Sequence, residues 1–468
     1  MRLPAIFPLG LVVMSAAGDV EVVLNVKDTG YRGIWYSVGR LDNEYVYKYS
    51  GGLGTYCSSH NPHAVYAPEA NKTFFVYGGT RPGERALLAC VGCYDHASGK
   101  AFQPTILVDK GTDDAHDNPV LALGDGGYLW VFVSAHGAAR PAYILRSRKP
   151  YDIEAFDLVE ATNYSYPQPW HFPGRGFLLL HTRYEEGGRS LFGQSSPDGR
   201  VWSVPQRIAR VAFGHYAVSW PFFGAGKAGM AFNYHPDGFR GESSKKGLDY
   251  RTNVYYCETR DMGESWRNVQ GEALGLPLRT VDNPALVRDY EGEGLLCYLL
   301  NVAYDVQGNP AILHVTSTTW VSGPADRWLR VAYWDGAVWR FREVCRVDSN
   351  YDMGSLYIEA DGVWRIVAPT VSGPQAYNPG GEMALWISGD RGVTWSLRRQ
   401  LTRNSLFNHA YARVPLNAHS DFYAFWADGH GRRPSESRLY FCDRSGRKVW
   451  RLPHIVDGAW PAAPERVK

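Results

Sequence analysis

Several histidine, tyrosine and arginine residues in the first half of the chain are of the types that transfer protons and bind carboxylates. His116 stands in the run HDNP, His136 closes the apolar run YLWVFVSAH, and Tyr184 stands in the run TRY, with Arg189 shortly after it. Histidine and tyrosine can act as acid or base, and a guanidinium can hold a carboxylate through two parallel hydrogen bonds. His116, His136 and Tyr184 are therefore candidate catalytic residues, and Arg189 is a candidate substrate-binding residue.

Other polar side chains stand at the ends of predicted strands, where they could surround the same ligand. They alternate with apolar runs that are typical of buried strands. The further candidate substrate-binding residues are Asn118, His215, Tyr234, Tyr250 and Arg251.

These residue types fit β-elimination from a uronic acid in a polysaccharide. The C5 proton beside the carboxylate is very weakly acidic, so an enzyme must neutralise that carboxylate while negative charge develops. A base must take the C5 proton and an acid must protonate the leaving O4. The chemistry requires no metal, so we expect no catalytic cofactor and predict no metal ligands, although a structural metal ion stays open.

Two other enzyme classes are less well supported. A glycosidase needs a pair of carboxylates, and Glu185 and Glu186 have no opposing Asp or Glu at acid–base spacing. A serine hydrolase of the G-x-S-x-G type needs a motif that the sequence lacks. A sialidase-like hydrolase and a non-catalytic glycan-binding protein stay open as alternatives, although the Arg-Ile-Pro run of sialidases does not occur here.

Short hairpins containing an aspartate, a glycine and a tryptophan recur along the chain and predict the elements that position these residues. Ser388–Trp395 reads SGDRGVTW, Thr259–Trp266 reads TRDMGESW, and Ser196–Trp202 is a shortened copy. In such an Asp box the carboxylate accepts N–H groups of the turn, the glycine adopts a positive φ, and the tryptophan packs inward. Weaker copies are predicted at Trp334–Trp339, Asp443–Trp450, Asp95–Phe102 and Tyr151–Phe156.

A second series of polar-then-apolar strand starts runs in phase with the hairpins. Each start precedes one hairpin, and the spacing fits one four-stranded blade per repeat. The two series predict an all-β, seven-bladed β-propeller with Asp-box (BNR) hairpins. The strand starts lie at His60–Pro62, His116–Pro119, Tyr166–Pro169, His215–Ala217, Asp282–Pro284, Tyr351–Met353 and His409–Tyr411.

Propeller geometry places the candidate residues on one face. The first strand of every blade lines the central channel and begins at the mouth that also carries the loops between second and third strands. The Asp boxes connect third to fourth strands on the opposite face. We therefore expect the candidates to surround one mouth, and Arg200, inside an Asp box, to lie on the other face.

Composition limits the partners of the protein. The 468 residues contain 49 Lys and Arg against 47 Asp and Glu, with no basic block, so nucleic acid is not expected as a partner. No apolar run beyond the N-terminus is long enough to cross a membrane. The seven cysteines are too thinly spread for a disulfide scaffold. We expect a monomer whose partner is an anionic polysaccharide substrate.

The N-terminus has the order of a secretory signal. Arg2 precedes an apolar stretch from Leu3 to Met14, and small residues follow up to Ala17. Residues 1–17 are therefore predicted to be a signal peptide, and residues 18–468 a single catalytic propeller domain in a secreted or periplasmic protein.

Five segments resemble a known family. They are DDAHDNPVLALGDGGYLWVFVSAHG (113–137), HTRYEEGGRSLF (181–192), GHYAVSW (214–220), GLDYRTNVYY (247–256) and YDMGSLYIE (351–359). They resemble the BNR-repeat polysaccharide lyases that include the ulvan lyases of polysaccharide lyase families 24 and 25. The resemblance extends over most of the chain from about residue 30, and the HDNP and SxHG pair carries its specificity.

The resemblance implies cleavage of ulvan, a sulfated polymer of rhamnose 3-sulfate and uronic acid, by β-elimination. It implies that His116 and His136 match active-site histidines, that Tyr184 matches the catalytic tyrosine, and that Arg189 matches the carboxylate-neutralising arginine. Which of His116 and Tyr184 is base and which is acid stays open. Some members of the family carry metal.

Overall fold

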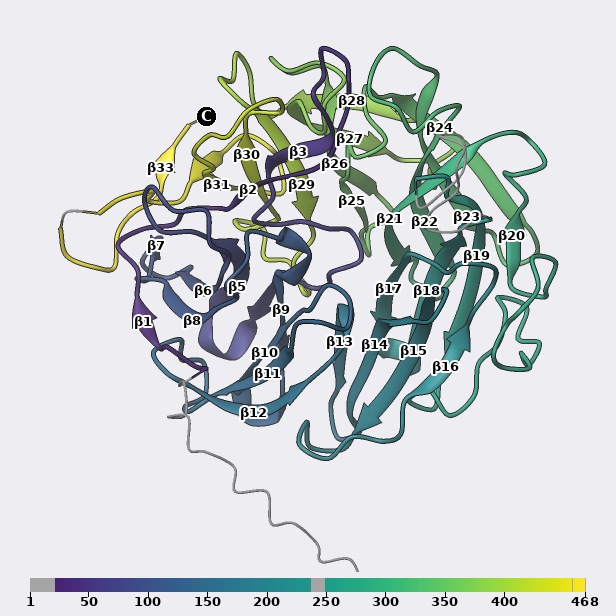
Figure 1. Ribbon diagram of the computed structural model, residues 1–468, viewed down its shortest axis with the longest axis horizontal. Helices are drawn as coiled ribbons and strands as arrows, with labels where there is room; N and C mark the ends of the chain where they lie inside the picture. Colours follow the sequence, from purple (N-terminus) through teal and green to yellow (C-terminus); the bar gives the residue numbers. More distant parts are fainter. Residues whose placement is uncertain (1–21, 237–248, 457, 468) are drawn as a thin grey trace, which may run out of the picture.

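The computed structural model describes residues 22–236, 249–456 and 458–467. Seven antiparallel sheets are arranged around a central axis, which confirms the predicted seven-bladed β-propeller (Figure 1). Each sheet is a meander whose first strand lies nearest the axis. The predicted signal peptide, residues 1–17, lies outside the described residues.

The first three blades use the N-terminal part of the chain. The first contains β4 (Ala64–Ala67), β5 (Lys72–Gly79), β6 (Leu88–Asp95) and β8 (Thr105–Asp109), with β7 (Lys100–Ala101) beside β6 and β1 (Val26–Lys27) beside β8. The second contains β9 (Pro119–Leu123), β10 (Leu129–Val133), β11 (Ala142–Ser147) and β12 (Phe156–Thr162). The third contains β13 (Ser165–Phe172), β14 (Gly176–Glu185), β15 (Gly188–Ser196) and β16 (Gln206–Ala209).

The remaining blades follow in chain order. The fourth contains β17 (Ala217–Phe222), β18 (Lys227–Tyr234), β19 (Thr252–Thr259) and β20 (Leu286–Arg288), and the fifth β21 (Leu296–Tyr304), β22 (Pro310–Ser317), β23 (Arg327–Trp334) and β24 (Trp339–Arg346). The sixth contains β25 (Ser355–Ile358), β26 (Trp364–Val371), β27 (Glu382–Ser388) and β28 (Ser396–Gln400). The seventh contains β29 (Asn408–Arg413), β30 (Ala424–Gly429), β31 (Leu439–Cys442), β32 (Val449–Arg451) and β33 (Glu465–Arg466).

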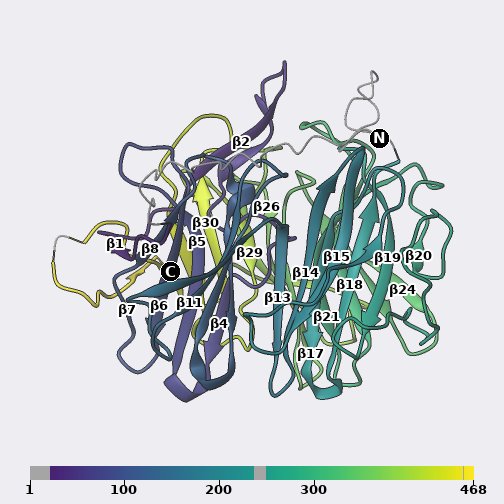
Figure 2. The same cartoon turned by 60° about the horizontal axis from the view of Figure 1, so that its bottom comes forward.

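A hairpin outside the blades rises above one mouth of the ring. It consists of β2 (Trp35–Arg40) and β3 (Tyr47–Gly52), and Figure 2 shows it projecting beyond the ends of the blade strands. Helical structure in the described residues is confined to single 3₁₀ turns, η1 (Pro68–Ala70), η2 (Ala115–Asp117), η3 (Asp125–Gly127) and η4 (Phe223–Ala225). None of the helices in the described part of the chain is long and apolar enough to cross a membrane.

All seven predicted Asp-box hairpins connect the third to the fourth strand of a blade. In the sixth blade Asp390 Oδ1 accepts the Thr394 N–H at 2.9 Å, and Gly392 takes a φ of +78°. In the fourth, Asp261 Oδ1 accepts the Ser265 N–H at the same distance. These local bonds explain why the hairpins could be recognised from short runs of sequence.

One predicted strand start is wrong. Asp282 is exposed and Asn283 is half-buried, and both precede β20, the outer strand of the fourth blade, whereas the fifth blade begins at Leu296. The chain makes a long excursion between β19 and β20, so the run DNP falls inside a blade. The run resembles HDNP in letters but lacks the η2 turn that positions His116.

The first and last blades meet without sharing a strand. β1 extends the first blade and β33 extends the last, so each sheet is built from its own end of the chain. Aromatic side chains fill the space between them: Tyr94 lies 5.0 Å from Phe441 and Phe75 lies 5.5 Å from Phe422, measured between ring centroids. We call this contact between the first and last blades the seam.

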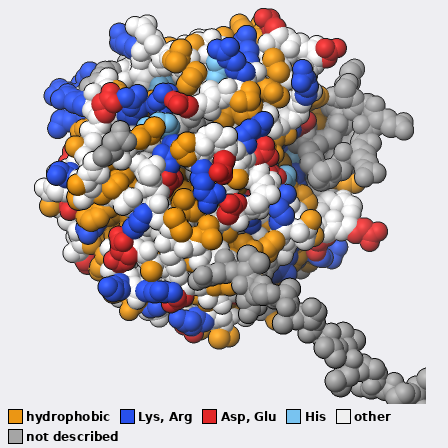
Figure 3. Space-filling view, turned by 60° about the vertical axis from the view of Figure 1, so that its left-hand side comes forward, with side chains coloured by type: hydrophobic (Ala, Val, Ile, Leu, Met, Phe, Trp, Pro, Cys, Tyr) orange, Lys and Arg blue, Asp and Glu red, His pale blue; other side chains and the backbone are white. Residues whose placement is uncertain are grey.

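The surface carries both signs of charge. Lys and Arg side chains are interspersed with Asp and Glu side chains over the face drawn in Figure 3, in keeping with a formal net charge of +2. All seven cysteines are unpaired, and six of them are buried.

Candidate functional site

The predicted catalytic residues lie together at one mouth of the channel. His116 belongs to η2, just before the first strand of the second blade, and His136 follows the second strand of that blade. Tyr184 lies near the end of β14 and Arg189 near the start of β15, directly opposite each other in the antiparallel pair. Strand starts and second-to-third loops therefore meet at one place, as the propeller geometry predicts.

Asp114 holds the two histidines. Its Oδ1 accepts Nδ1–H of His116 at 2.5 Å, and its Oδ2 lies 2.7 Å from Nδ1 of His136. The imidazole rings stack with centroids 4.0 Å apart. Arg140 donates to Asp114 at 2.8 Å and also to Asp117. Burial by itself would raise the pKa of Asp114, but the neighbouring imidazoles hold that pKa well below its usual range.

His116 lies beneath the surface, and His136 faces the mouth. His116 is only 4% exposed, and its Nε2 is 2.9 Å from the Tyr56 hydroxyl and 3.0 Å from the Tyr49 hydroxyl. Burial and the neighbouring His136 lower the pKa of His116 to about 4, so it is neutral near pH 7. The His136 side chain is 31% exposed. His116 is thus buried among tyrosine hydroxyls, while His136 is accessible to a ligand.

Two buried guanidiniums lie behind the mouth. Arg189 is fully buried and donates to Nε2 of His235 at 2.8 Å, and Arg251 is 6% exposed and donates to the Tyr351 hydroxyl at 3.1 Å. Neither forms an ion pair with a carboxylate of the described residues. Because a buried unpaired charge is costly, the pair favours an anion beside it.

Two tyrosines flank these guanidiniums and differ in acidity. The Tyr184 hydroxyl is 3.5 Å from Arg189 Nη1, and burial raises its pKa although Arg189 opposes the rise. The Tyr216 ring lies 4.1 Å from the Arg189 guanidinium and 4.2 Å from that of Arg251. Burial also disfavours the Tyr216 phenolate, yet the two guanidiniums lower the pKa of Tyr216 to about 8. The Tyr184 phenol is thus kept protonated, whereas the Tyr216 phenol is partly ionised near pH 8.

Three predicted binding residues bond to groups of the protein itself, two of them to the backbone and one to a carboxylate. Asn118 is fully buried and donates to the carbonyls of Leu53 and Tyr56, each at 2.8 Å. His215 is fully buried, accepts the Val211 N–H at 2.9 Å and bonds the Asn233 carbonyl at 2.7 Å. Tyr234 is buried with its hydroxyl on Glu291. These contacts use the Asn118 amide N–H groups, the His215 ring and the Tyr234 hydroxyl within the fold, so we expect these residues to support the site and not to bind the ligand directly.

Two predicted binding residues remain, Tyr250 and Arg251, and several site residues were not predicted. Tyr250 is half-buried beside the central core, and Arg251 lies in the site. Sequence reasoning missed Tyr216 and His235, each next to a residue that was chosen. Successive side chains of a strand point to opposite faces, so that alternation was the available signal. The other missed residues are Asp114, Tyr49, Tyr56 and Tyr166.

Replacing Tyr234 by phenylalanine tests its reassignment. The change leaves Glu291 without its phenol partner, so we expect a loss of about 1 kcal/mol in the free energy of unfolding. Turnover should stay within about twofold of the parent, because the hydroxyl faces away from Arg189. Denaturant unfolding and steady-state kinetics on the same preparation measure both quantities, and a large kinetic loss with unchanged stability would restore the binding role.

The chain also resembles known proteins in sequence. The chain is 25% identical to an ulvan lyase of Nonlabens ulvanivorans, with 48% of this chain and 53% of that protein covered. It is 23% identical to an ulvan lyase of Alteromonas sp. (strain LOR), with 66% and 68% covered. The chain thus spans about half the length of the first relative and about two thirds of the second.

A solved structure shares the architecture. It is that of a PL25 ulvan lyase bound to -[GlcA(1-4)Rha3S]-, which superposes with a TM-score of 0.69 at 18% identity and covers 89% of this chain and 96% of its own. At that identity the likeness shows the fold. Residues 84–347 match the model of a BNR repeat-containing family member. Since that match takes in more than half of the chain, as well as the mouth residues from His116 to Arg251, this protein belongs to the BNR repeat-containing family.

Proposed function

We propose that this protein is a polysaccharide lyase that cleaves a sulfated rhamnose–uronic acid polymer of the ulvan type by β-elimination at the uronate. The observation that carries the proposal is the pair of buried guanidiniums, Arg189 and Arg251, which have no carboxylate partner among the described residues. They lie beside two tyrosines whose pKa values are shifted in opposite directions, that of Tyr184 upward and that of Tyr216 downward. The names of the relatives support the same chemistry.

The substrate carboxylate supplies the missing negative charge. Bound beside Arg189, the uronate carboxylate would be neutralised, so that charge can develop on it when C5 loses its proton. The guanidinium is held by His235 and by the Tyr216 ring, and it therefore needs no rearrangement during the reaction. Arg251, which packs on the same ring, adds to the positive potential.

The two tyrosines divide the proton transfers. The Tyr216 phenolate takes the C5 proton, and the electron pair left behind forms the C4–C5 double bond as the C4–O4 bond breaks. The Tyr184 hydroxyl gives its proton to O4 of the leaving sugar. Neighbouring groups whose environments push their pKa values apart are suited to act as base and acid. The exposed His136, fixed by Asp114, contacts the chain of sugars beside them.

The reaction product distinguishes this function from its alternatives. Only a lyase creates the conjugated 4,5-unsaturated uronate, which absorbs ultraviolet light, whereas a sialidase-like hydrolase creates a saturated reducing end and a glycan-binding propeller creates neither. Ultraviolet absorbance should rise when the protein is mixed with ulvan. Reducing ends without that absorbance, or binding without cleavage, would reject the proposal.

Export is part of the same proposal. A polymeric algal substrate is met outside the cell, so we propose that residues 1–17 direct secretion and are removed near Ala17. A monomer with no nucleic-acid or membrane partner stays our prediction. No metal is needed for the proton transfers proposed here.

Replacing Tyr184 by phenylalanine should lower turnover of ulvan at least about a hundredfold, the scale for losing a positioned proton donor. The ring stays in place, so the Michaelis constant should change much less than turnover. The Tyr234→Phe protein serves as the matched control, because it removes a hydroxyl from a tyrosine that faces away from the site. Near-parental turnover by the Tyr184→Phe protein would assign the acid elsewhere.

A further inference from the structure

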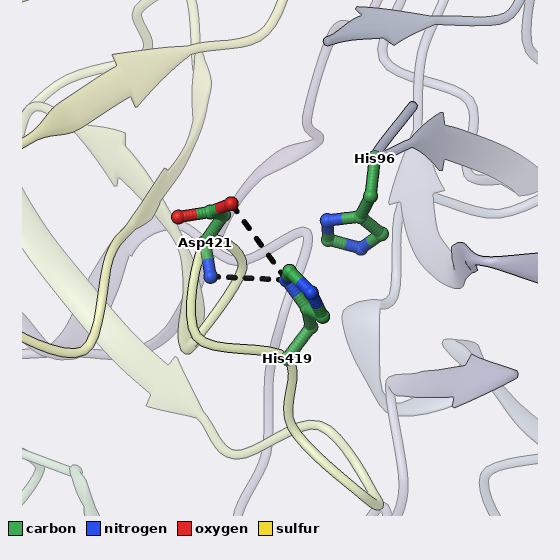
Figure 4. Close-up of side chains that lie close together, drawn as sticks. All are labelled: His96, His419 and Asp421. Atoms are coloured by element: carbon green, nitrogen blue, oxygen red, sulfur yellow. Dashed lines mark hydrogen bonds and ion pairs between the residues drawn. The ribbon is translucent and has the colours of Figure 1, made fainter. Parts of the chain in front are cut away.

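We propose that His96, His419 and Asp421 form a binding site for zinc or a similar divalent transition metal that joins the first and last blades across the seam. The site lies on the face opposite the catalytic mouth, and the proposal is independent of the proposed function. His96 follows β6 in the Asp-box turn of the first blade, whereas His419 and Asp421 lie in the loop between β29 and β30 of the last blade. Figure 4 shows the three side chains directed into one space.

The three side chains supply a metal-like set of ligand atoms. One ligand atom from each lies within 4.8 Å of the other two, and the imidazole rings of His96 and His419 are 3.8 Å apart between centroids. Two imidazoles and one carboxylate suit zinc and related divalent transition metals. Zinc bonds of about 2.0–2.1 Å place tetrahedral ligands ~3.4 Å apart, so ligand atoms that lie up to 4.8 Å apart must approach by up to about 1.4 Å. Asp421 is exposed, and the half-buried His419 is oriented by the Asp421 N–H, which its Nδ1 accepts at 3.1 Å.

His96 is already prepared as a ligand. Its Nε2 lies 2.8 Å from the hydroxyl of Thr73, a buried residue of β5, and this bond fixes the ring. Its Nδ1 is inaccessible to solvent and has no hydrogen-bond partner. A buried polar atom without a partner is costly, and coordination of a metal would satisfy it. Hydrogen bonding of the second ring nitrogen is also the usual way in which a ligating histidine is oriented.

The position of the site gives the metal a structural task. The first and last blades share no strand, and their contact consists of packed aromatic side chains and a few backbone hydrogen bonds, such as that from the Tyr66 N–H to the Leu416 carbonyl at 2.9 Å. Tyr66 packs against both histidines, at 5.3 Å from His96 and 4.8 Å from His419 between centroids. A cation held by both blades would connect residues more than 300 positions apart and oppose opening of the ring. Exposed Asp421 leaves room for water as a fourth ligand.

Zinc chloride added to the chelator-treated full-length protein tests the site. Titration calorimetry should show one zinc ion bound per chain, and the Tm should rise by at least about 2 °C at saturating zinc, because a ligand of the folded state stabilises it. The His96→Gln and His419→Gln proteins should bind zinc at least about tenfold more weakly and lose the Tm shift. Thr73→Val should weaken binding about tenfold, because Nε2 of His96 loses its partner.

Two control proteins make the result specific. His171 is a half-buried histidine of the third blade beside Asp125 on the same face, and His171→Gln should bind zinc like the parent. His136→Gln removes the exposed histidine from the other group that could hold a metal, Asp114, His116 and His136, and should also retain binding. The proposal is overturned if the parent binds no zinc, or if His96→Gln and His419→Gln bind it as tightly as the parent does.

Discussion

Replacing Arg189 by alanine is expected to lower kcat/KM for ulvan at least about a hundredfold, which corresponds to about 3 kcal/mol of lost transition-state stabilisation. The guanidinium is fully buried, is held by His235 at 2.8 Å, and has no described carboxylate beside it. The charge therefore has no counter-ion among the described residues, and we expect a substrate carboxylate to supply one. Initial rates from the ultraviolet absorbance of the unsaturated product measure the effect.

Two further arginine variants give that experiment its control. Arg189→Lys should recover only part of the loss, because an ammonium cannot supply two parallel hydrogen bonds to a carboxylate. Arg200 stands in the same blade but is exposed in an Asp box on the opposite face, so Arg200→Ala should leave kcat/KM unchanged and alter stability by less than about 0.5 kcal/mol. A greater loss from Arg200→Ala than from Arg189→Ala would show that the site is on the other face.

Replacing Tyr216 by phenylalanine should lower turnover at least about a hundredfold and also change its dependence on pH. Arg189 and Arg251 outweigh burial and lower the pKa of Tyr216 to about 8. The active form is the phenolate, so activity of the parent should fall as the pH drops below about 8 and the phenolate is protonated. Above that pH the rate should level off.

The pH profile separates the base from a residue that only packs against the arginines. Phenylalanine keeps the ring between Arg189 and Arg251 but has no group that ionises, so the limb near pH 8 should disappear from the profile of kcat/KM. Tyr184→Phe should keep that limb at a lower rate, because it removes the acid. A Tyr216→Phe protein that retains the limb would show that another group is the base.

The number of blades and the face of the site could be predicted from the sequence because both depend on local patterns. Each Asp box closes its own turn with hydrogen bonds such as that from the Thr394 N–H to Asp390, so the hairpins can be recognised in short stretches of sequence. Seven of them count the blades. The mouth then follows from strand direction, and it brings together His116, His136, Tyr184 and Arg189 as predicted.

The choice among neighbouring residues could not be made in the same way. His215 and Tyr234 were selected where Tyr216 and His235 line the site, an error of one position in each strand. A shift of one position moves a side chain to the other face of the sheet, and a bulge between Phe232 and Tyr234 disturbs the alternation at the end of β18. Tyr49 and Tyr56 reach His116 from a segment before the first blade, and no repeat marks that segment.

The separate construction of the first and last blades has a consequence for chain connectivity. Every sheet of the ring is formed by one continuous stretch of sequence, and the peptide links between blades add only isolated bridges, such as that between Ala212 and His235. A circularly permuted gene that opens the chain between β16 and β17 would leave each sheet whole. The contact between the present first and last blades would then be an internal junction of the chain. The order in which blades are synthesised is therefore separable from the shape that they make. Duplication or loss of a whole blade during evolution would likewise leave the sheets of the other blades intact.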